Sequence, residues 1–279
     1  MEKKYEIILF GATGFTGQLC AKYFKQNYSD LTWAIAGRDK NKLDDINNKF
    51  NLNVDTLVAD GDNLEALRVM AGQAKVILST AGPFARYSDL LVQACVEQGT
   101  HYTDITGENH WVRTLIDKHH ENASLKGVRI VPSCGYDSIP SDIGTFFAVS
   151  QFNKPVKRVE LFQEMQGGAS GGTIETAFSM GKLSKEMRDP FLLNPENSST
   201  EEQRKYSKDT MRIEKIEELD GWSGMFVMAA GNTRVVRRTA ALMEQNQNSY
   251  GANFTFGEYG LHKTKKLARR ASYGLILGF

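Results

Sequence analysis

Residues 7–17 read IILFGATGFTG, four apolar residues followed by glycines at positions 11, 14 and 17. The apolar run predicts a buried strand, and residues 18–24 continue with the apolar spacing of a helix. A strand, a tight glycine turn and a helix in succession are the setting of a dinucleotide-binding loop. The alternative interpretation of the same pattern is an ordinary strand-to-helix turn, because the spacing is GxxGxxG and not GxGxxG.

Each glycine has a physical reason in a dinucleotide-binding loop. Gly11 lets the chain reverse with positive φ, Gly14 lets a pyrophosphate approach the backbone, and Gly17 lets the helix pack closely on the strand. The pyrophosphate then lies on free N–H groups at the positive end of the helix. The cofactor-binding residues predicted in this loop are Gly11, Ala12, Thr13, Gly14, Phe15, Thr16 and Gly17.

The end of the second predicted strand, residues 32–38, indicates which dinucleotide binds. An acidic side chain there would accept the ribose 2′-hydroxyl of NAD, whereas an arginine suits the 2′-phosphate of NADP. No acid precedes Arg38, and Lys40 and Lys42 follow it. We therefore expect NADP in preference to NAD, with a solvated basic turn as the alternative.

Strands and helices alternate along the first half of the chain. Further strands are predicted at 54–60, 75–80, 101–105 and 128–132, with helical spacing between them. This rhythm predicts an α/β fold, a doubly wound parallel sheet of the Rossmann type over residues 1–132. An α+β second domain is expected over 133–260 for substrate binding or dimerisation, and a C-terminal helix over 261–279 that returns to the first domain.

The strand exits supply the remaining cofactor candidates. Ligands bind at the carboxyl ends of the strands in open α/β sheets. Small residues after the fourth strand leave room for the nicotinamide half of the cofactor, and the third strand ends in an acid. The predicted residues are Asp60, Thr80, Ala81, Gly82 and Pro83.

The amino-acid composition limits the classes of protein to which this chain can belong. The 279 residues are 41% hydrophobic and 24% charged with a net charge of +1, which is ordinary for a globular protein and does not favour nucleic acid. The three cysteines lack CxxC spacing and favour a reducing, cytoplasmic setting. No apolar run reaches the ~18 residues of a membrane span, and no signal peptide is expected before the first strand.

Candidate proton donors follow the fifth and sixth strands. Asp104, Tyr136 and Asp137 are the predicted catalytic residues, because a hydride transfer needs a nearby group to supply a proton. The alternative for Asp137 and Ser138 is to cap the following helix. Cys134 is expected to be a packed thiol and Cys95 a core thiol, the histidines form no metal pattern, and the Tyr259-x-x-x-Lys263 spacing is attributed to chance.

Two features of the second half of the chain each have both a functional and a structural interpretation. The glycine-rich turn at 167–173 would bind an anion or act as a hinge. Arg234, Arg237 and Arg238 would bind an anionic substrate or pair with acids across the domain interface. The polar segment 189–209 is expected to be an exposed loop or weak helix.

Several motifs together resemble one family. GATGFTG at 11–17, AGR at 36–38, STAGPF at 79–84, HYTDITGE at 101–108, SCGYDSIPSDIG at 133–144 and NTRVVRR at 232–238 are similar to saccharopine-dehydrogenase-like oxidoreductases, closest to their trans-acting enoyl reductase branch. The resemblance implies an NADP-binding Rossmann domain and an α+β domain, with Thr80, Ala81 and Gly82 on the nicotinamide side. It does not identify the substrate.

Members of that family are longer, so we expect this chain to be shortened at its C-terminus. Basic residues from Lys263 to Arg270 precede the apolar residues 275–279, and a basic amphipathic helix can lie on an anionic membrane surface. The alternative is a helix packed on the first domain, with an exposed apolar end that promotes self-association.

The function expected from these features is NADP-dependent reduction of a C=C, C=N or C=O bond in an acyl-lipid or small-molecule substrate. Two alternatives remain: a non-catalytic NADP-binding sensor, and a lipid-surface protein that has lost turnover. Expected partners are the small-molecule or acyl-chain substrate, a membrane surface at the periphery and a second copy in a homodimer, and no nucleic acid.

Overall fold

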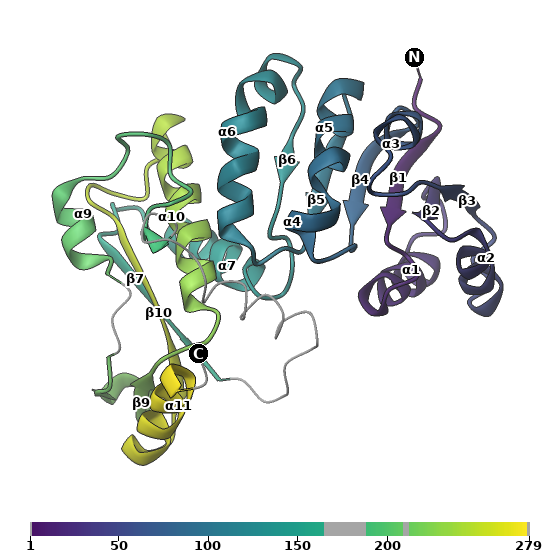
Figure 1. Cartoon of the computed structure of the whole chain (residues 1–279). Helices are drawn as coiled ribbons and strands as arrows, with labels where there is room; N and C mark the ends of the chain where they lie inside the picture. The colour runs from purple at the N-terminus through teal and green to yellow at the C-terminus, as the bar shows by residue number, and fades with distance from the viewer. Residues whose placement is uncertain (1, 165–187, 209–211, 278–279) are drawn as a thin grey trace. The chain divides into compact units, whose positions relative to one another are not determined.

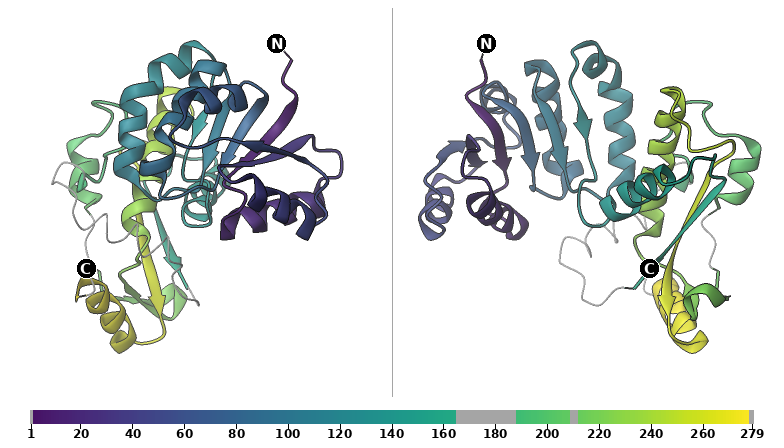
Figure 2. Two further views of the ribbon diagram at one scale, coloured as in Figure 1. Left: turned by 45° about the vertical axis from the view of Figure 1, so that its right-hand side comes forward. Right: turned by 180° about the vertical axis from the view of Figure 1, so that it is seen from behind.

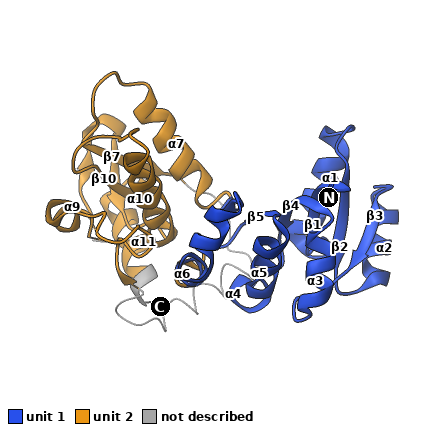
Figure 3. Ribbon diagram, turned by 90° about the horizontal axis from the view of Figure 1, so that it is seen from above, with its two compact units in different colours: residues 1–106, 111–135 blue, residues 107–110, 136–279 orange. Residues whose placement is uncertain are grey.

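The computed structural model describes residues 2–164, 188–208 and 212–277 of the chain, with side chains given up to residue 274. Contacts divide the chain into two compact units (Figure 3). Unit 1 comprises residues 1–106 and 111–135, and unit 2 comprises residues 107–110 and 136–279. The glycine-rich turn predicted at 167–173 lies outside the described residues.

Unit 1 is built on a six-stranded sheet in the order β3-β2-β1-β4-β5-β6, with every pairing parallel (Figure 1). Its strands are β1 (Tyr5–Phe10), β2 (Trp33–Gly37), β3 (Asp55–Val58), β4 (Ala74–Ser79), β5 (His101–Asp104) and β6 (Ile130–Val131). Figure 2 shows helices on both sides of this sheet. After β1 the chain adds β2 and β3 on one side of it and then β4, β5 and β6 on the other, and such folds bind ligands at this switch point between β1 and β4.

The helices of unit 1 connect successive parallel strands. They are α1 (Phe15–Asn27), α2 (Lys40–Lys49), α3 (Leu64–Ala71), α4 (Phe84–Tyr87), α5 (Asp89–Gln98) and α6 (Asn109–Leu125), whose first two residues belong to unit 2. Two of them, α2 and α3, begin at side-chain caps: Asp39 accepts a hydrogen bond from the Lys42 N–H and Asn63 from the Ala66 N–H, both at 3.1 Å. Cys95 of α5 is fully buried, which confirms the predicted core thiol.

Unit 2 contains a four-stranded mixed sheet in the order β7-β10-β9-β8. Its elements are α7 (Ile139–Ser150), β7 (Arg158–Gln163), α9 (Glu201–Tyr206), β8 (Lys215–Ile216), η2 (Glu217–Leu219), β9 (Gly221–Gly224), α10 (Ala229–Gln245), β10 (Thr255–His262) and α11 (Lys265–Leu277). Strand β10 pairs parallel with β7 and antiparallel with β9. The parallel sheet of unit 1 and this mixed sheet with its helices confirm the predicted fold class.

Two segments of unit 2 differ from the expectation. Residues 189–208 contain the short exposed helix α9, which agrees with the weak helix predicted, but Phe191 and Leu193 are buried and the Arg237 guanidinium lies 5.4 Å from the Phe191 ring. Helix α11 packs on β9 and β10 within unit 2, with Ala268 and Ser272 fully buried, where the sequence predicted docking on the first domain. Among the described helices, none has both the length and the apolar character that a membrane crossing requires.

Candidate dinucleotide-binding site

The loop after β1 turns sharply at its first glycine. Gly11 has a φ of +84°, as predicted, and its N–H donates to the carbonyl of Ala36 at 2.9 Å. The Gly14 N–H donates back to the Gly11 carbonyl at 3.1 Å. These bonds fix the loop between the ends of β1 and β2 and direct the chain into α1.

Gly11 and Gly17 are required by the packing of the protein itself. A Cβ on Gly11 would lie 2.8 Å from the Ala81 nitrogen, and one on Gly17 would lie 2.3 Å from the Gly11 carbonyl oxygen. Neither backbone atom can move without displacing a strand end. Gly17 therefore has the role predicted for it, since it allows α1 to approach the loop closely.

Gly14 has no such internal reason to be glycine. A Cβ there would meet only the Gly11 carbonyl oxygen, at 3.4 Å, and the Gly14 φ of −71° suits any residue. Gly14 is also the N-cap of α1, and no side chain caps this helix. The first N–H groups of a helix have no intrahelical acceptor and attract anions. The arrangement therefore fits a pyrophosphate seated beside Gly14.

The exit of β4 supports the loop from the other side. The Thr80 N–H donates to the Phe10 carbonyl at 2.9 Å, and the Thr80 hydroxyl lies 3.2 Å from the carbonyls of Phe10 and Gly11. Gly82 and Pro83 lead into α4, where Phe84 is buried and stacks on Trp111 with ring centroids 6.3 Å apart. The structure thus brings Thr80 and Ala81 against the predicted phosphate loop.

Arg38 extends into solvent from the end of β2. Among the described residues it has no hydrogen-bond or ion-pair partner, whereas Lys40 pairs with Asp44 at 2.9 Å. The nearby Asp39 carboxylate caps α2 through the Lys42 N–H. Because the acid is engaged with a helix and the guanidinium is available, the end of β2 offers a cation where the ribose substituent of a dinucleotide would lie.

Asp60 has a local partner in the structure. One of its carboxylate oxygens accepts a hydrogen bond from the Asp62 N–H at 3.2 Å, closing a turn ahead of α3. The side chain is exposed at the end of the segment that follows β3. A cofactor contact by Asp60 stays a prediction.

Asp104 does not have the surroundings of a proton donor. It is fully buried and accepts hydrogen bonds from the Tyr102 hydroxyl at 2.9 Å, the Thr106 N–H at 2.9 Å and the Ser133 N–H at 3.0 Å. Burial and the Asp104 charge raise the pKa of Tyr102 well above its usual value. The carboxylate joins the end of β5 to the segment after β6, and a catalytic role for Asp104 stays a prediction.

Tyr136 and Asp137, two of the predicted catalytic residues, lie at the start of the second segment of unit 2, just before α7. The Tyr136 side chain is 81% exposed, and partial desolvation raises the pKa of Asp137. The predicted capping role is not observed, because α7 has no side-chain cap and the Ser138 hydroxyl donates instead to the Asn232 amide oxygen at 3.0 Å. The half-buried Cys134 thiol lies 3.4 Å from the Val131 carbonyl.

A buried polar network in unit 2 was not predicted from the sequence. One carboxylate oxygen of Glu258 accepts hydrogen bonds from Ser141 at 2.7 Å, Gln163 at 3.1 Å and Asn232 at 3.2 Å. Glu258 is 5% exposed, and this burial raises its pKa. Ser138, Ser141 and Asn232 come from the SCGYDSIPSDIG and NTRVVRR motifs, so these two motifs meet in one structural cluster.

The three arginines of α10 bind backbone carbonyls. Arg234 donates to the Arg188 carbonyl at 2.9 Å, and Arg237 donates to Pro190 at 2.9 Å and to Phe256 at 3.2 Å. Arg238 donates to the Leu193 carbonyl. These contacts hold the 188–193 segment on α10. They favour a structural role for the three arginines over binding of an anionic substrate, with backbone carbonyls as partners in place of the predicted acids.

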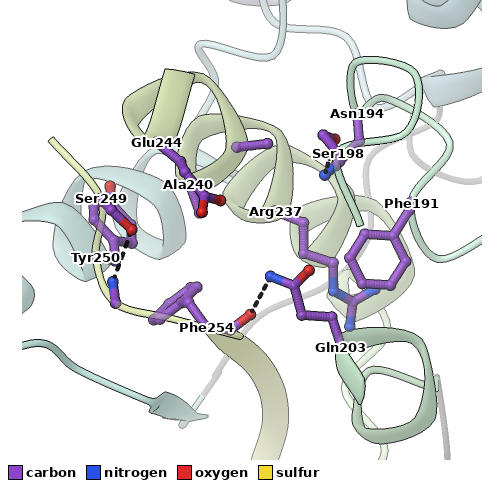
Figure 4. Close-up of a pocket in the computed structure, with 12 residues that line it drawn as sticks. Phe191, Asn194, Ser198, Gln203, Arg237, Ala240, Glu244, Ser249, Tyr250 and Phe254 are labelled. Atoms are coloured by element: carbon purple, nitrogen blue, oxygen red, sulfur yellow. Dashed lines mark hydrogen bonds between the residues drawn. The ribbon is translucent and has the colours of Figure 1, made fainter. Parts of the chain in front are cut away.

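Figure 4 shows a hollow in unit 2 where Phe191, Arg237 and Tyr250 converge. Gln203 donates to the Phe254 carbonyl at 3.2 Å across one side of it. Its cavity volume is about 10 Å³, which is close to the space that one water molecule occupies. This hollow is too small for a substrate.

Asp142 of α7 provides a pH-dependent prediction. It accepts a hydrogen bond from Thr239 at 2.9 Å, and burial raises its pKa from 3.8 to about 6. A raised pKa in the folded state means that protonation stabilises the fold below pH ~4 and that this contribution is lost as the pH rises through about 6.

We therefore expect Asp142→Asn to raise the free energy of unfolding relative to the parent by more at pH 7 than at pH 4. The difference between the two pH values should be on the order of 2 kcal/mol. Urea unfolding of both proteins at the two pH values measures this difference. A larger gain at pH 4 than at pH 7 would have the wrong sign and would contradict the assignment.

Comparisons with known proteins agree with this site. The profile of the saccharopine dehydrogenase NADP binding domain matches residues 7–131. A putative trans-acting enoyl reductase of Mycobacterium tuberculosis is 34% identical over 277 residues, covering 92% of this chain and 65% of that protein. The trans-acting enoyl reductase of Mycobacterium ulcerans is 34% identical over 299 residues, covering 99% of this chain and 71% of that protein.

Among solved structures, the apo saccharopine dehydrogenase (L-Glu forming) of Saccharomyces cerevisiae is 14% identical, with a TM-score of 0.47, over 57% of this chain and 34% of that one. The chain spans 65% of the length of the first mycobacterial relative. The sequence identity over nearly the whole of this chain is what assigns the family. The chain belongs to the saccharopine-dehydrogenase-like family, in its branch of trans-acting enoyl reductases.

Proposed function

We propose that the chain is an NADP-dependent oxidoreductase that reduces a C=C, C=N or C=O bond of an acyl-chain or small-molecule substrate. The observation that carries this proposal is the open backbone at Gly14 on the uncapped N-terminus of α1. A glycine that packing does not require, where helix N–H groups are free, is explained by a phosphate that lies against it.

Bound NADPH would supply the hydride. In this proposal the chain binds the pyrophosphate through residues 14–17, binds the 2′-phosphate through Arg38, and faces the nicotinamide half with the exit of β4. Tyr136 and Asp137 remain candidates for holding the proton at the phenol or carboxyl oxygen, because both are exposed. The name of the relatives, enoyl reductase, supports an unsaturated acyl substrate.

Turnover distinguishes the proposal from its alternatives. We expect the chain to oxidise NADPH, followed at 340 nm, when it is given unsaturated acyl thioesters, and not in their absence. NADPH binding without turnover on acyl thioesters, imines and carbonyl compounds would favour the sensor. Flotation with anionic vesicles without NADPH binding would favour the lipid-surface protein.

Arg38→Ala should weaken NADPH binding and leave NADH binding unchanged. Losing a charge-assisted contact to the 2′-phosphate costs ~1.5–3 kcal/mol, which corresponds to about a 10- to 150-fold rise in the NADPH dissociation constant. Calorimetric titration of both dinucleotides measures the change.

Lys22→Ala is the matched control, since Lys22 is an exposed cation on α1 and should leave both affinities unchanged. An Arg38 variant that weakens NADPH and NADH equally would mean that the guanidinium does not read the 2′-phosphate.

A further inference from the structure

Glu258 places a carboxyl group where packing alone favours an apolar side chain. Residues two apart on a strand share a face, so Glu258 of β10 lies on the same face as Phe256, which belongs to a buried apolar cluster with Val236. Glu258 is 5% exposed, and its partners among the described residues are all neutral. Burying an acid without a cation is costly, and an apolar residue of similar volume is often at least as stabilising. This carboxyl therefore has a reason other than packing.

The reason is the set of polar groups that the carboxyl gathers. Its oxygen Oε1 accepts from Ser141 Oγ at 2.7 Å, Gln163 Nε2 at 3.1 Å and Asn232 Nδ2 at 3.2 Å. These donors lie on α7, β7 and α10, so one oxygen atom joins these elements to β10. The other oxygen, Oε2, is buried and has no partner among the described residues. Burial raises the pKa of Glu258 and so favours its neutral form.

Asn232 extends this network to the segment ahead of α7. Its side chain is 1% exposed, and its amide nitrogen donates to Glu258 at 3.2 Å. Its amide oxygen accepts a hydrogen bond from the Ser138 hydroxyl at 3.0 Å. Ser138 directly follows Tyr136 and Asp137, the two exposed candidates for holding the proton. The Glu258 carboxyl is therefore linked to this pair through one amide and one hydroxyl.

On the basis of the function proposed above, we propose that Glu258 is a positioning residue for the reduction. It acts through Asn232 and Ser138 and fixes the two residues that precede Ser138, where the proton is to be held. Ser138 is the N-cap residue of α7, yet its hydroxyl makes no capping bond and is engaged with α10 instead. Misplacing a reacting group by about 1 Å can slow a reaction on the order of 100-fold.

The first test removes the link next to the candidate pair. Ser138→Ala loses the hydroxyl that is bound to Asn232, while Glu258 keeps its three donors. We expect kcat for NADPH oxidation with unsaturated acyl thioesters to fall about 10- to 100-fold, with KM for NADPH unchanged. Ser150→Ala is the matched control and should leave both constants unchanged, because Ser150 is exposed at the other end of α7 and donates only to the Phe147 carbonyl at 2.7 Å.

A pair of substitutions tests Glu258 itself. Glu258→Ala should lower kcat as Ser138→Ala does. Glu258→Gln should recover most of the parent rate, because its amide oxygen keeps the acceptor in a neutral side chain. A role confined to stability would lower the yield of folded Glu258→Ala and leave kcat per folded molecule unchanged. That result, or a Glu258→Gln chain as slow as Glu258→Ala, would overturn the proposal, and Ser138→Ala decides it if Glu258→Ala does not fold.

A carbon-13 NMR titration of the Asp137 carboxyl tests the placement without turnover. Partial desolvation holds the pKa of Asp137 above its usual value. Releasing the segment in Ser138→Ala should lower this pKa towards the usual value of an aspartate, whereas Ser150→Ala should not change it. An unchanged Asp137 pKa in Ser138→Ala would overturn the positioning by Glu258. A parent that turns over no substrate would contradict the proposed function instead, so the two failures are distinguishable.

Discussion

Gly14→Val should give a folded protein that binds both NADPH and NADH at least about 30-fold more weakly than the parent. The valine side chain would extend into the open space above the N-terminus of α1, where a pyrophosphate needs to contact backbone N–H groups. Losing that contact costs at least ~2 kcal/mol, or about 30-fold in affinity for both dinucleotides. Titration calorimetry and a thermal melt measure binding and folding on the same sample.

Gly17→Val is the informative contrast. Its Cβ would lie 2.3 Å from the Gly11 carbonyl oxygen, so this variant should lose stability as well as binding. If Gly14→Val is folded and retains the parent affinity for both dinucleotides, the phosphate loop has been assigned wrongly.

Asp104→Ala should lower the free energy of unfolding by about 3 kcal/mol or more. The substitution removes the acceptor for the Tyr102 hydroxyl and for the N–H groups of Thr106 and Ser133, and leaves them buried. Each buried donor without a partner costs ~1–3 kcal/mol. Urea unfolding followed by circular dichroism measures the loss.

Asp60→Ala is the control for this prediction, since its exposed carboxylate closes only a local turn and its removal should cost less than ~1 kcal/mol. A catalytic Asp104 would behave differently. Asp104→Asn would then retain the parent stability and lose turnover, and that result would support the predicted catalytic role.

The phosphate loop could be predicted because its requirements are local. A buried strand, three glycines and a helix within 17 residues determine both the turn at Gly11 and the close packing at Gly17. The parallel sheet could be predicted for the same reason, since the spacing of strands and helices along the chain already implies crossover connections.

The hydrogen-bond partners of Asp104 could not be predicted because one of them is distant in sequence. An aspartate at the end of a strand has the same local pattern whether it faces a ligand or the N–H of Ser133, 29 residues later. The arginines of α10 present the same difficulty: helical spacing predicts a shared face, and only the folded chain shows that Arg237 binds the carbonyls of Pro190 and Phe256.

Helix α7 shows where hydrophobic periodicity misleads. Ile139, Ile143 and Phe147 have the spacing of a core-facing stripe, yet they are exposed. The buried Glu258 accepts a hydrogen bond from Ser141 of α7, which holds the polar side of the helix inward. Glu258 lies more than a hundred residues downstream, and no local pattern connects it with α7.

The proposed function requires that unit 1 bind NADP through Gly14 and Arg38. The most direct test is to titrate the unmutated chain with NADPH and with NADH under identical conditions and to compare the two dissociation constants. We predict that NADPH binds at least about tenfold more tightly, because only NADPH carries the 2′-phosphate that Arg38 can bind. Equal dissociation constants, or no binding of either dinucleotide, would contradict it.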